Sequence, residues 1–131
     1  MDAEGGASSF RVGVPWGVLR FESVGGDGDI PDIDPVDSPV EANTTCMVIA
    51  VVHPDIGPVD VTVLLGEGGA EAAVGIFDGL FDVPNGEVEV ADLVGEDFCH
   101  RFAVAGSRVR VRVSVDDPQM AQSVVLRITA E

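Results

Sequence analysis

Alternation of apolar and polar residues with a period of two runs through most of the chain and limits what it can fold into. Residues 108–115, Arg-Val-Arg-Val-Arg-Val-Ser-Val, are the clearest case, and residues 59–65 and 98–104 follow a similar pattern. A period of two places successive side chains on opposite faces of a β-strand, whereas an amphipathic helix needs a period of 3.6. No apolar stretch with the helical period is long enough for a helix. The alternation therefore predicts an all-β protein.

The expected strands are short and are separated by turns rich in glycine and proline. They lie within residues 10–21, 46–52, 59–65, 74–83, 88–90, 98–104, 108–115 and 124–128. Strands of this length and spacing are typical of an antiparallel β-sandwich, here with about seven or eight strands. Within residues 10–21 the apolar parity changes beside Pro15 and Gly17, which indicates a bulge or a strand that bends between sheets.

Three local features refine this prediction. The continuous apolar run at residues 46–52 predicts a central strand buried on both faces. Gly79 predicts a bulge within the strand at residues 74–83. Pro84-Asn85-Gly86 is the strongest turn signal, because Asn-Gly tolerates the positive φ angles that tight hairpins need.

One domain is expected over residues 1–131, because the single strand unit before residue 24 cannot bury its apolar face alone. Residues 1–8 are expected to be flexible. Residues 24–45 contain three prolines and no regular period, and they predict a long acidic loop that is a candidate functional element. Neither a signal peptide nor a membrane-spanning run is recognisable, so a cytoplasmic location is expected.

The charge of the chain excludes several classes of partner. It has 23 Asp and Glu against 7 basic residues, all of them Arg, which gives a net charge of −16. Nucleic acids and anionic membranes attract cationic surfaces, so neither is expected as a partner. Two explanations of the acidity stay open. It serves a basic partner, or it reflects a host with GC-rich coding or a salt-adapted proteome and says nothing about a partner.

The densest group of carboxylates lies in Gly-Gly-Asp-Gly-Asp-Ile-Pro-Asp-Ile-Asp-Pro-Val-Asp, which ends at residue 37. Closely spaced aspartates can supply the oxygens that Ca²⁺ requires, but Pro31 and Pro35 interrupt the spacing of a helix-loop-helix calcium site. No metal and no cofactor is therefore assigned, and a solvated loop or a partner-facing patch remains. We predict as partner-binding residues the aspartates of this group together with one aromatic residue: Asp27, Asp29, Asp32, Asp34, Asp37 and Trp16.

Trp16 has two interpretations, a core anchor or an exposed contact residue. The basic ladder of Arg108, Arg110 and Arg112 also has two interpretations. The simpler one is pairing across the sheet with Glu87, Glu89 and other carboxylates of neighbouring strands, and the alternative is an anion site or docking stripe.

Cysteine and histidine give no catalytic constellation. Cys46 and Cys99 are expected to be buried thiols, and a disulfide requires that their strands face each other. Cys99 and His100 are adjacent and point to opposite faces of a strand, which argues against a zinc site and against a nucleophilic Cys–His pair. His100 is expected to line the edge of the core. No catalytic residue is assigned and the protein is not expected to be an enzyme.

Two motifs support a family resemblance. They are His53-Pro-Asp-Ile-Gly-Pro-Val-Asp-Val-Thr-Val63 and Phe102-Ala-Val-Ala-Gly-Ser-Arg-Val-Arg-Val111. Their order, after an opening strand and a long acidic loop, resembles a family of small bacterial β-sandwich proteins related to competence protein J, an inhibitor of the DNA-entry nuclease. The chain departs from that family at Asp116-Asp-Pro and at its end, which lacks a Trp-Pro pair. The resemblance implies a β-sandwich that inhibits a nuclease.

The sequence thus favours a non-enzymatic acidic binding protein, of an inhibitor or immunity type, that docks on a basic partner such as a nuclease. The alternative is a structural module of a phage, an envelope or a homo-oligomer. A second alternative is a metal-binding protein that uses the aspartate loop. The oligomeric state is left open.

Overall fold

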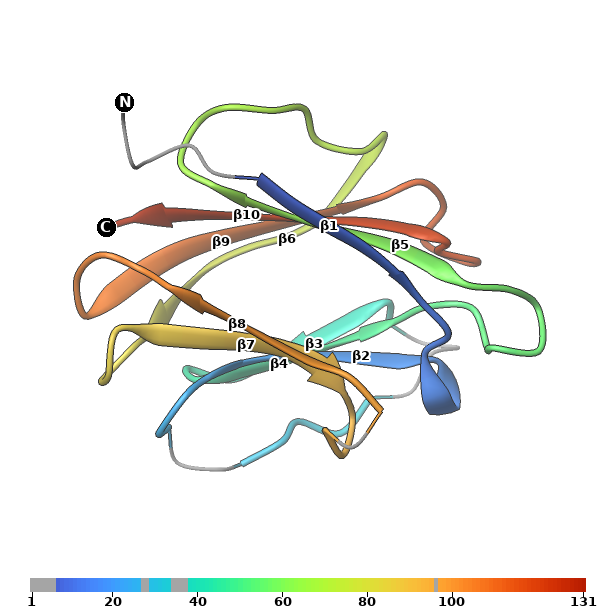
Figure 1. Ribbon diagram of the computed structural model, residues 1–131, viewed down its shortest axis with the longest axis horizontal. Helices are drawn as coiled ribbons and strands as arrows, with labels where there is room; N and C mark the ends of the chain where they lie inside the picture. Colours follow the sequence, from blue (N-terminus) through green and yellow to red (C-terminus); the bar gives the residue numbers. More distant parts are fainter. Residues whose placement is uncertain (1–6, 27–28, 34–37, 96) are drawn as a thin grey trace.

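The computed structural model describes residues 7–26, 29–33, 38–95 and 97–131, and these residues are almost entirely β-structure (Figure 1). The elements are β1 (Ala7–Val12), η1 (Pro15–Gly17), β2 (Val18–Ser23), β3 (Val40–Ala42), β4 (Cys46–Ala50), β5 (Val59–Leu65), β6 (Val74–Asp82), β7 (Glu87–Asp92), β8 (Cys99–Ala103), β9 (Arg108–Val115) and β10 (Ser123–Ala130). Sheet A has the order β1-β5-β10-β9-β6, and sheet B has the order β3-β4-β2-β7-β8. The two sheets stack face to face, and the all-β prediction is confirmed.

The number of strands is ten, where the sequence predicted seven or eight. Residues 10–21 contribute to two strands, because the chain leaves sheet A after β1, turns at η1 and enters sheet B as β2. The change of apolar parity beside Pro15 marks this passage between sheets. The other additional strand, β3, has only three residues and lies within the segment 24–45 that was predicted to be a loop.

One strand pair departs from the expected antiparallel arrangement. β10 runs parallel to β5, with Val124 opposite Val61 and Leu126 opposite Val63. All other pairs are antiparallel. The chain visits sheet B twice and returns to sheet A each time, so neighbouring strands come from distant parts of the sequence and need not be joined as hairpins.

The turn predicted at Pro84-Asn85-Gly86 is present, but it does not form a hairpin. The Gly86 N–H donates to the Val83 carbonyl (3.4 Å), and Gly86 has a φ of 69° that favours glycine. However, the turn joins β6 of sheet A to β7 of sheet B, so the flanking strands do not pair. The bulge of β6 also lies elsewhere than predicted, between Gly75 and Phe77.

The core lies between the sheets and is built from the inward-facing positions of the alternating strands. In sheet A the inward valines of β5 and β9 are fully buried, and in sheet B Leu19, Phe21, Met47 and Ile49 are fully buried. The rings of Phe21 and Phe81 meet edge to face across the two layers, with centroids 5.3 Å apart.

The outer face of sheet B is partly covered. Residues 29–33 run beneath this sheet, on the side away from sheet A (Figure 1). Cys46 and Val48 have no exposed surface, although the side chains of Met47 and Ile49 face the core between the sheets. The prediction that this strand is buried on both faces is therefore confirmed for β4.

The outer face of sheet A is crossed by the loop that joins β5 to β6, since β10 and β9 lie between these two strands (Figure 1). Arg127 of β10 lies under this loop and is only 5% exposed. Its guanidinium donates to the carbonyls of Gly66 (2.7 Å), Gly68 (2.9 Å) and Gly69 (2.9 Å) and to the Glu71 carboxylate (2.7 Å). The side chain thereby holds the crossing loop on the sheet.

Candidate interaction surface

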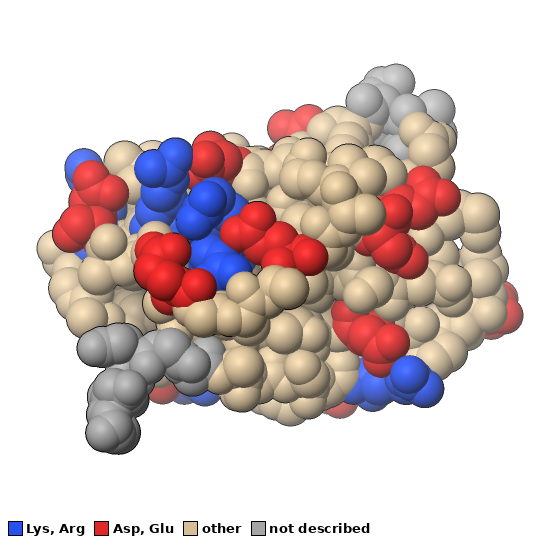
Figure 2. All heavy atoms as spheres, turned by 90° about the horizontal axis from the view of Figure 1, so that it is seen from above, with Lys and Arg blue, Asp and Glu red and all other residues tan. Residues whose placement is uncertain are grey.

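All seven arginines lie in strands, and the chain has no lysine. Six of them form ion pairs with carboxylates of their own or neighbouring elements: Arg11 with Asp60, Arg20 with Glu22 and Glu89, Arg101 with Glu89, Arg108 with Asp82, Arg110 with Asp78, and Arg127 with Glu71. Figure 2 shows part of this pattern, with blue and red side chains interspersed on one region of the surface.

The arginine ladder of β9 pairs with β6. Arg110 binds Asp78 through two hydrogen bonds of 2.7 and 2.8 Å, and Arg108 lies 3.3 Å from Asp82. The hydrogen bonds from Arg110 lower the pKa of Asp78 below its ordinary value. Cross-strand pairing is therefore confirmed, but its carboxylates are not Glu87 and Glu89, because β7 belongs to the other sheet.

Glu89 belongs instead to a charge cluster on the outer face of sheet B. It lies 3.0 Å from Arg20, which is 7% exposed, and 3.2 Å from Arg101. The Cys99 thiol donates to the same carboxylate (3.5 Å), and partial burial followed by the charge of Glu89 raises the pKa of this thiol. The prediction of a buried thiol is confirmed for Cys46 and is wrong for Cys99, which is exposed on the edge strand β8.

This arrangement separates the two signs of charge. All the arginines lie in strands, and their ion pairs neutralise part of the negative charge that the strands carry. The segments between the described strands contain no Lys or Arg, and most of the 23 Asp and Glu residues lie in them or at the termini. The loops therefore carry many carboxylates and no Lys or Arg of their own, and Glu71 is the loop carboxylate that pairs with an arginine of a strand, Arg127.

The aspartate group of residues 27–37 is described in part. Asp29 and Asp32 are exposed. Pro31, which lies between them, and Ile33, which follows Asp32, are half-buried. The predicted binding residues Asp27, Asp34 and Asp37 lie outside the described residues. Among the residues that the structure describes, no three His, Cys, Asp or Glu side chains converge to hold a metal ion.

Trp16 is exposed, so its interpretation as a core anchor is wrong. It occupies the third position of the turn Val14–Pro15–Trp16–Gly17, which the Gly17 N–H closes by donating to the Val14 carbonyl (3.0 Å). Its φ and ψ are 65° and 0°, the conformation that a type II turn requires at this position and that glycine normally supplies. A bulky residue with a positive φ angle of this kind carries a backbone strain of about 1–2 kcal/mol.

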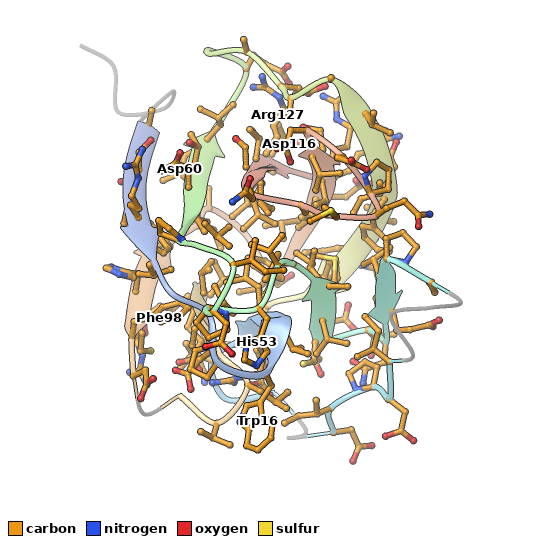
Figure 3. All side chains as sticks on the ribbon, turned by 90° about the vertical axis from the view of Figure 1, so that its right-hand side faces the viewer. Trp16, His53, Asp60, Phe98, Asp116 and Arg127 are labelled. Atoms are coloured by element: carbon orange, nitrogen blue, oxygen red, sulfur yellow. The ribbon has the colours of Figure 1, made fainter. Side chains whose placement is uncertain are left out.

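Four loops meet at the end of the molecule where Trp16 lies. The carbonyl of Gly17 accepts a hydrogen bond from the Val51 N–H (2.9 Å), and the Val52 N–H donates to the Ala121 carbonyl (3.0 Å). The loop after β7 joins them, because Asp92 pairs with Leu19 at the start of β2. We call this the end-loop surface and define it by the described residues of four segments, 13–17, 51–58, 93–97 and 116–122. Figure 3 looks onto this end, with Trp16 at the lower edge of the view, His53 above it and Asp116 toward the upper edge.

The end-loop surface combines exposed apolar side chains with carboxylates. Its four segments carry Trp16, Ile56, Val94 and Met120, whose exposed fractions are 73%, 58%, 62% and 51%. They also carry Asp55, Asp97, Asp116 and Asp117, all exposed.

Two aspartates fix these loops. Asp116 Oδ1 accepts the N–H groups of Asp117, Gln122 and Ser123 at 2.9–3.1 Å, which closes the loop between β9 and β10. The buried Asp92 Oδ1 accepts the N–H groups of Asp97 and Phe98 and closes the loop between β7 and β8. Part of the acidity therefore serves the fold.

His100 lies at the edge of the two-layered core, as predicted, although its own side chain is exposed. Its ring stacks on Phe10 of β1 with centroids 4.0 Å apart, and Phe98 lies 6.0 Å from Phe10. This stack joins the edge strands β1 and β8 of the two sheets.

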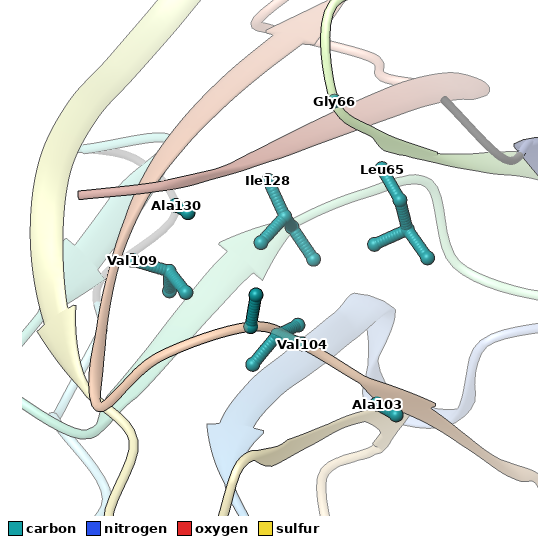
Figure 4. A pocket seen from close by; sticks show the side chains of 8 residues that line it. Leu65, Gly66, Ala103, Val104, Val109, Ile128 and Ala130 are labelled. Atoms are coloured by element: carbon teal, nitrogen blue, oxygen red, sulfur yellow. The ribbon is translucent and has the colours of Figure 1, made fainter. Parts of the chain in front are cut away.

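An apolar pocket of about 260 Å³ opens where β8 leads into β9 (Figure 4). Leu65, Val104, Val109 and Ile128 line it, with Gly66 and three alanines completing its wall. The lining has no titratable side chain, so the pocket offers no acid–base pair.

No helix in the described ranges is long and apolar enough to cross a membrane.

The fold and the surface define a small acidic protein of two stacked five-stranded sheets. No family model matches the chain, and none of the curated proteins compared with it matches in sequence. Two solved structures share its fold. One is ComJ of Bacillus subtilis, an inhibitor of the DNA-degrading activity of NucA, with a TM-score of 0.67, 7% identity, and coverage of 98% of this chain and 100% of ComJ. The other is the protein of crocagin biosynthetic gene J, with a TM-score of 0.58, 12% identity, and coverage of 100% and 99%.

These likenesses confirm the predicted resemblance to the competence protein J family at the level of the fold. Sequence reasoning proposed Trp16 and the aspartates of residues 27–37 as binding residues, and it missed Ile56, Val94 and Met120 as exposed residues of one end of the molecule. Each of these is a single apolar residue in a loop, and only the assembly of four loops places them at the same end.

Proposed function

We propose that this chain is a non-enzymatic, inhibitor-like protein that binds a basic protein, and that its partner is a DNA-degrading nuclease of the same cell. It acts as a single domain in the cytoplasm. The separation of charge carries the proposal. Six arginines are engaged in ion pairs, five of them with carboxylates of strands, while the loops and termini carry most of the carboxylates and no Lys or Arg.

Physical reasoning connects this charge pattern to a nuclease. A nuclease binds polyanionic DNA through a cationic cleft, so a rigid scaffold that displays carboxylates is complementary to it. Asp29 and Asp32 are exposed, and together with Asp27, Asp34 and Asp37 they provide negative charge that speeds encounter with such a partner. The fold shared with ComJ, which inhibits a DNA-degrading activity, supports the same class of function.

A DNA-degradation assay tests the proposal. Extract of the organism that encodes the chain is fractionated by cation exchange, and each fraction is incubated with plasmid DNA at low salt with and without the purified protein. We expect the protein to suppress degradation in at least one fraction, and to lose this effect at high salt. If no fraction is inhibited at low salt, the proposal is wrong.

A pair of charge-matched variants locates the effect. Asp32→Asn removes one exposed carboxylate of the aspartate group, and Glu67→Gln removes one exposed carboxylate from the crossing loop over sheet A. We expect Asp32→Asn to weaken inhibition by about two- to fivefold and Glu67→Gln to leave it unchanged. Size-exclusion chromatography accompanies the assay, since a stable symmetric oligomer without inhibition would favour an assembly module instead.

A further inference from the structure

We propose that the end-loop surface is the face that contacts the partner, and that Trp16 inserts into an apolar pocket bordered by Arg or Lys side chains on that partner. This inference rests on the proposed function, because it assumes a basic protein partner. It adds the contact site, its central residue and the surface chemistry that the partner must offer.

The first argument is the concentration of exposed apolar side chains. Seven large hydrophobic residues are exposed in the described chain, and four of them lie in the end-loop surface: Trp16, Ile56, Val94 and Met120. Scattered exposed apolar residues are ordinary, whereas a group of them within one set of loops is typical of a contact site. Trp is also the side chain most enriched at the energetic centres of protein interfaces.

The second argument is the backbone of Trp16. The turn would be satisfied better by glycine at this position, and the mostly exposed indole makes little contribution to the core. The fold therefore gains nothing evident from Trp in place of Gly. Strained residues that remain in a structure gather at functional sites, and an indole held outward in a closed turn fits that pattern.

The third argument is that the surface is organised before binding. Backbone hydrogen bonds link three of the four segments, and the fourth follows β7, which pairs with β2. The carboxylates of Asp92 and Asp116 close two of the loops. A contact site that is already ordered loses less conformational entropy on binding than a mobile one.

Charge complementarity identifies the occupant. Asp55, Asp97, Asp116 and Asp117 accompany the apolar group, and the four segments contain no Lys or Arg. A second copy of this chain would place like charges against each other, which is costly across an interface. A partner with Arg or Lys around an apolar pocket would satisfy both parts of the surface.

The experiment compares four immobilised proteins: the wild type, Trp16→Gly, Trp16→Phe and Leu80→Ser. Leu80 is an exposed apolar residue of β6, away from the end loops, and serves as the matched control. Extract of the encoding organism is passed over each protein at low salt, and the DNA-degrading activity left in the flow-through is measured over a range of immobilised protein concentrations. The melting temperature of each variant is measured in parallel.

We expect Trp16→Gly to bind the DNA-degrading activity about 30-fold more weakly, which corresponds to roughly 2 kcal/mol, with Trp16→Phe intermediate and Leu80→Ser equal to the wild type. The melting temperature of Trp16→Gly should equal or exceed that of the wild type, because glycine removes the strain of the turn.

Each other result has a defined meaning. If the wild type and Trp16→Gly deplete the activity equally, the inference is overturned and the proposed function stands. If Trp16→Gly melts well below the wild type, Trp16 serves the fold and the inference is overturned. If the wild type depletes nothing at low salt, the proposed function fails and the inference fails with it.

Discussion

Single residues of the same chemical type have different surroundings in this protein. Asp92 and Asp116 close loops, and Asp60 and Asp78 bind arginines across sheet A. Asp32 and Trp16 are exposed side chains for which the fold shows no evident use. The chemical type of a residue is therefore a poor guide to its role here, and the structural surroundings decide.

The pair Arg11–Asp60 gives a direct test at the scale of the residue. The Arg11 guanidinium donates two hydrogen bonds to Asp60, at 2.7 and 3.3 Å, and these bonds lower the pKa of that carboxyl below its ordinary value. A depressed pKa in the folded state means that the pair stabilises the fold at neutral pH. This contribution is lost as the pH falls through the folded-state pKa.

We expect Arg11→Gln to raise the pKa of Asp60 toward the ordinary value of about 3.9. A side-chain carbon NMR titration measures it, and the pKa of Asp78 in the same sample is the control, since its partner Arg110 is unchanged. An unchanged pKa of Asp60 in the variant would show that Arg11 is not the cause.

At the scale of the element, the alternation of apolar residues predicted most strands because each inward position is buried in one common core. It could not predict β3, which is too short to show a period. A period of two also does not indicate that Arg20 is buried, with only 7% of its surface exposed. The assignment of strands to sheets was equally inaccessible, since turns such as residues 83–86 join different sheets and look like hairpin turns in sequence.

The candidate site, like the strands, could be predicted from the sequence only in part. The change of parity beside Pro15 and Gly17 indicated a bulge or a bend, but nothing in the pattern indicated that Trp16 has a positive φ angle as well as Gly17. The crossing loop of residues 66–73 contains three glycines, and its sequence does not indicate that it is held on the sheet. Its order comes from Arg127, which lies far away in sequence.

Arg127 supplies a prediction for this element. Replacing it by Gln removes the guanidinium from beneath the crossing loop and leaves three glycine carbonyls and Glu71 without their donor. We expect the free energy of unfolding to fall by about 3 kcal/mol, as measured by urea denaturation. The exposed pair of Arg108 is the control, and Arg108→Gln should cost less than about 1 kcal/mol. Equal losses in the two variants would contradict the role assigned to Arg127.

At the scale of the whole molecule, the excess of carboxylates has a cost that the ion pairs offset only in part. A net charge of −16 on 131 residues repels itself in the folded state. The six paired arginines neutralise charge on the strands, while the loops remain negative. The molecule therefore keeps a repulsive field that is useful only if something basic binds to it, or if its host is rich in salt.

Salt should accordingly stabilise the isolated protein. Screening acts over about 8 Å at physiological ionic strength and weakens the repulsion among loop carboxylates. We expect the melting temperature to rise between low salt and about 0.3 M NaCl, as followed by circular dichroism. A melting temperature that falls over this range would show that attraction within the ion pairs exceeds the repulsion.

The most direct test of the central claim is the salt dependence of binding between this protein and the DNA-degrading nuclease that we propose as its partner. If loop carboxylates attract a basic partner, the dissociation constant should rise about tenfold or more between about 0.05 and 0.3 M NaCl, mainly through a slower association rate. A dissociation constant that does not change with salt, or the absence of any binding at low salt, would contradict the account.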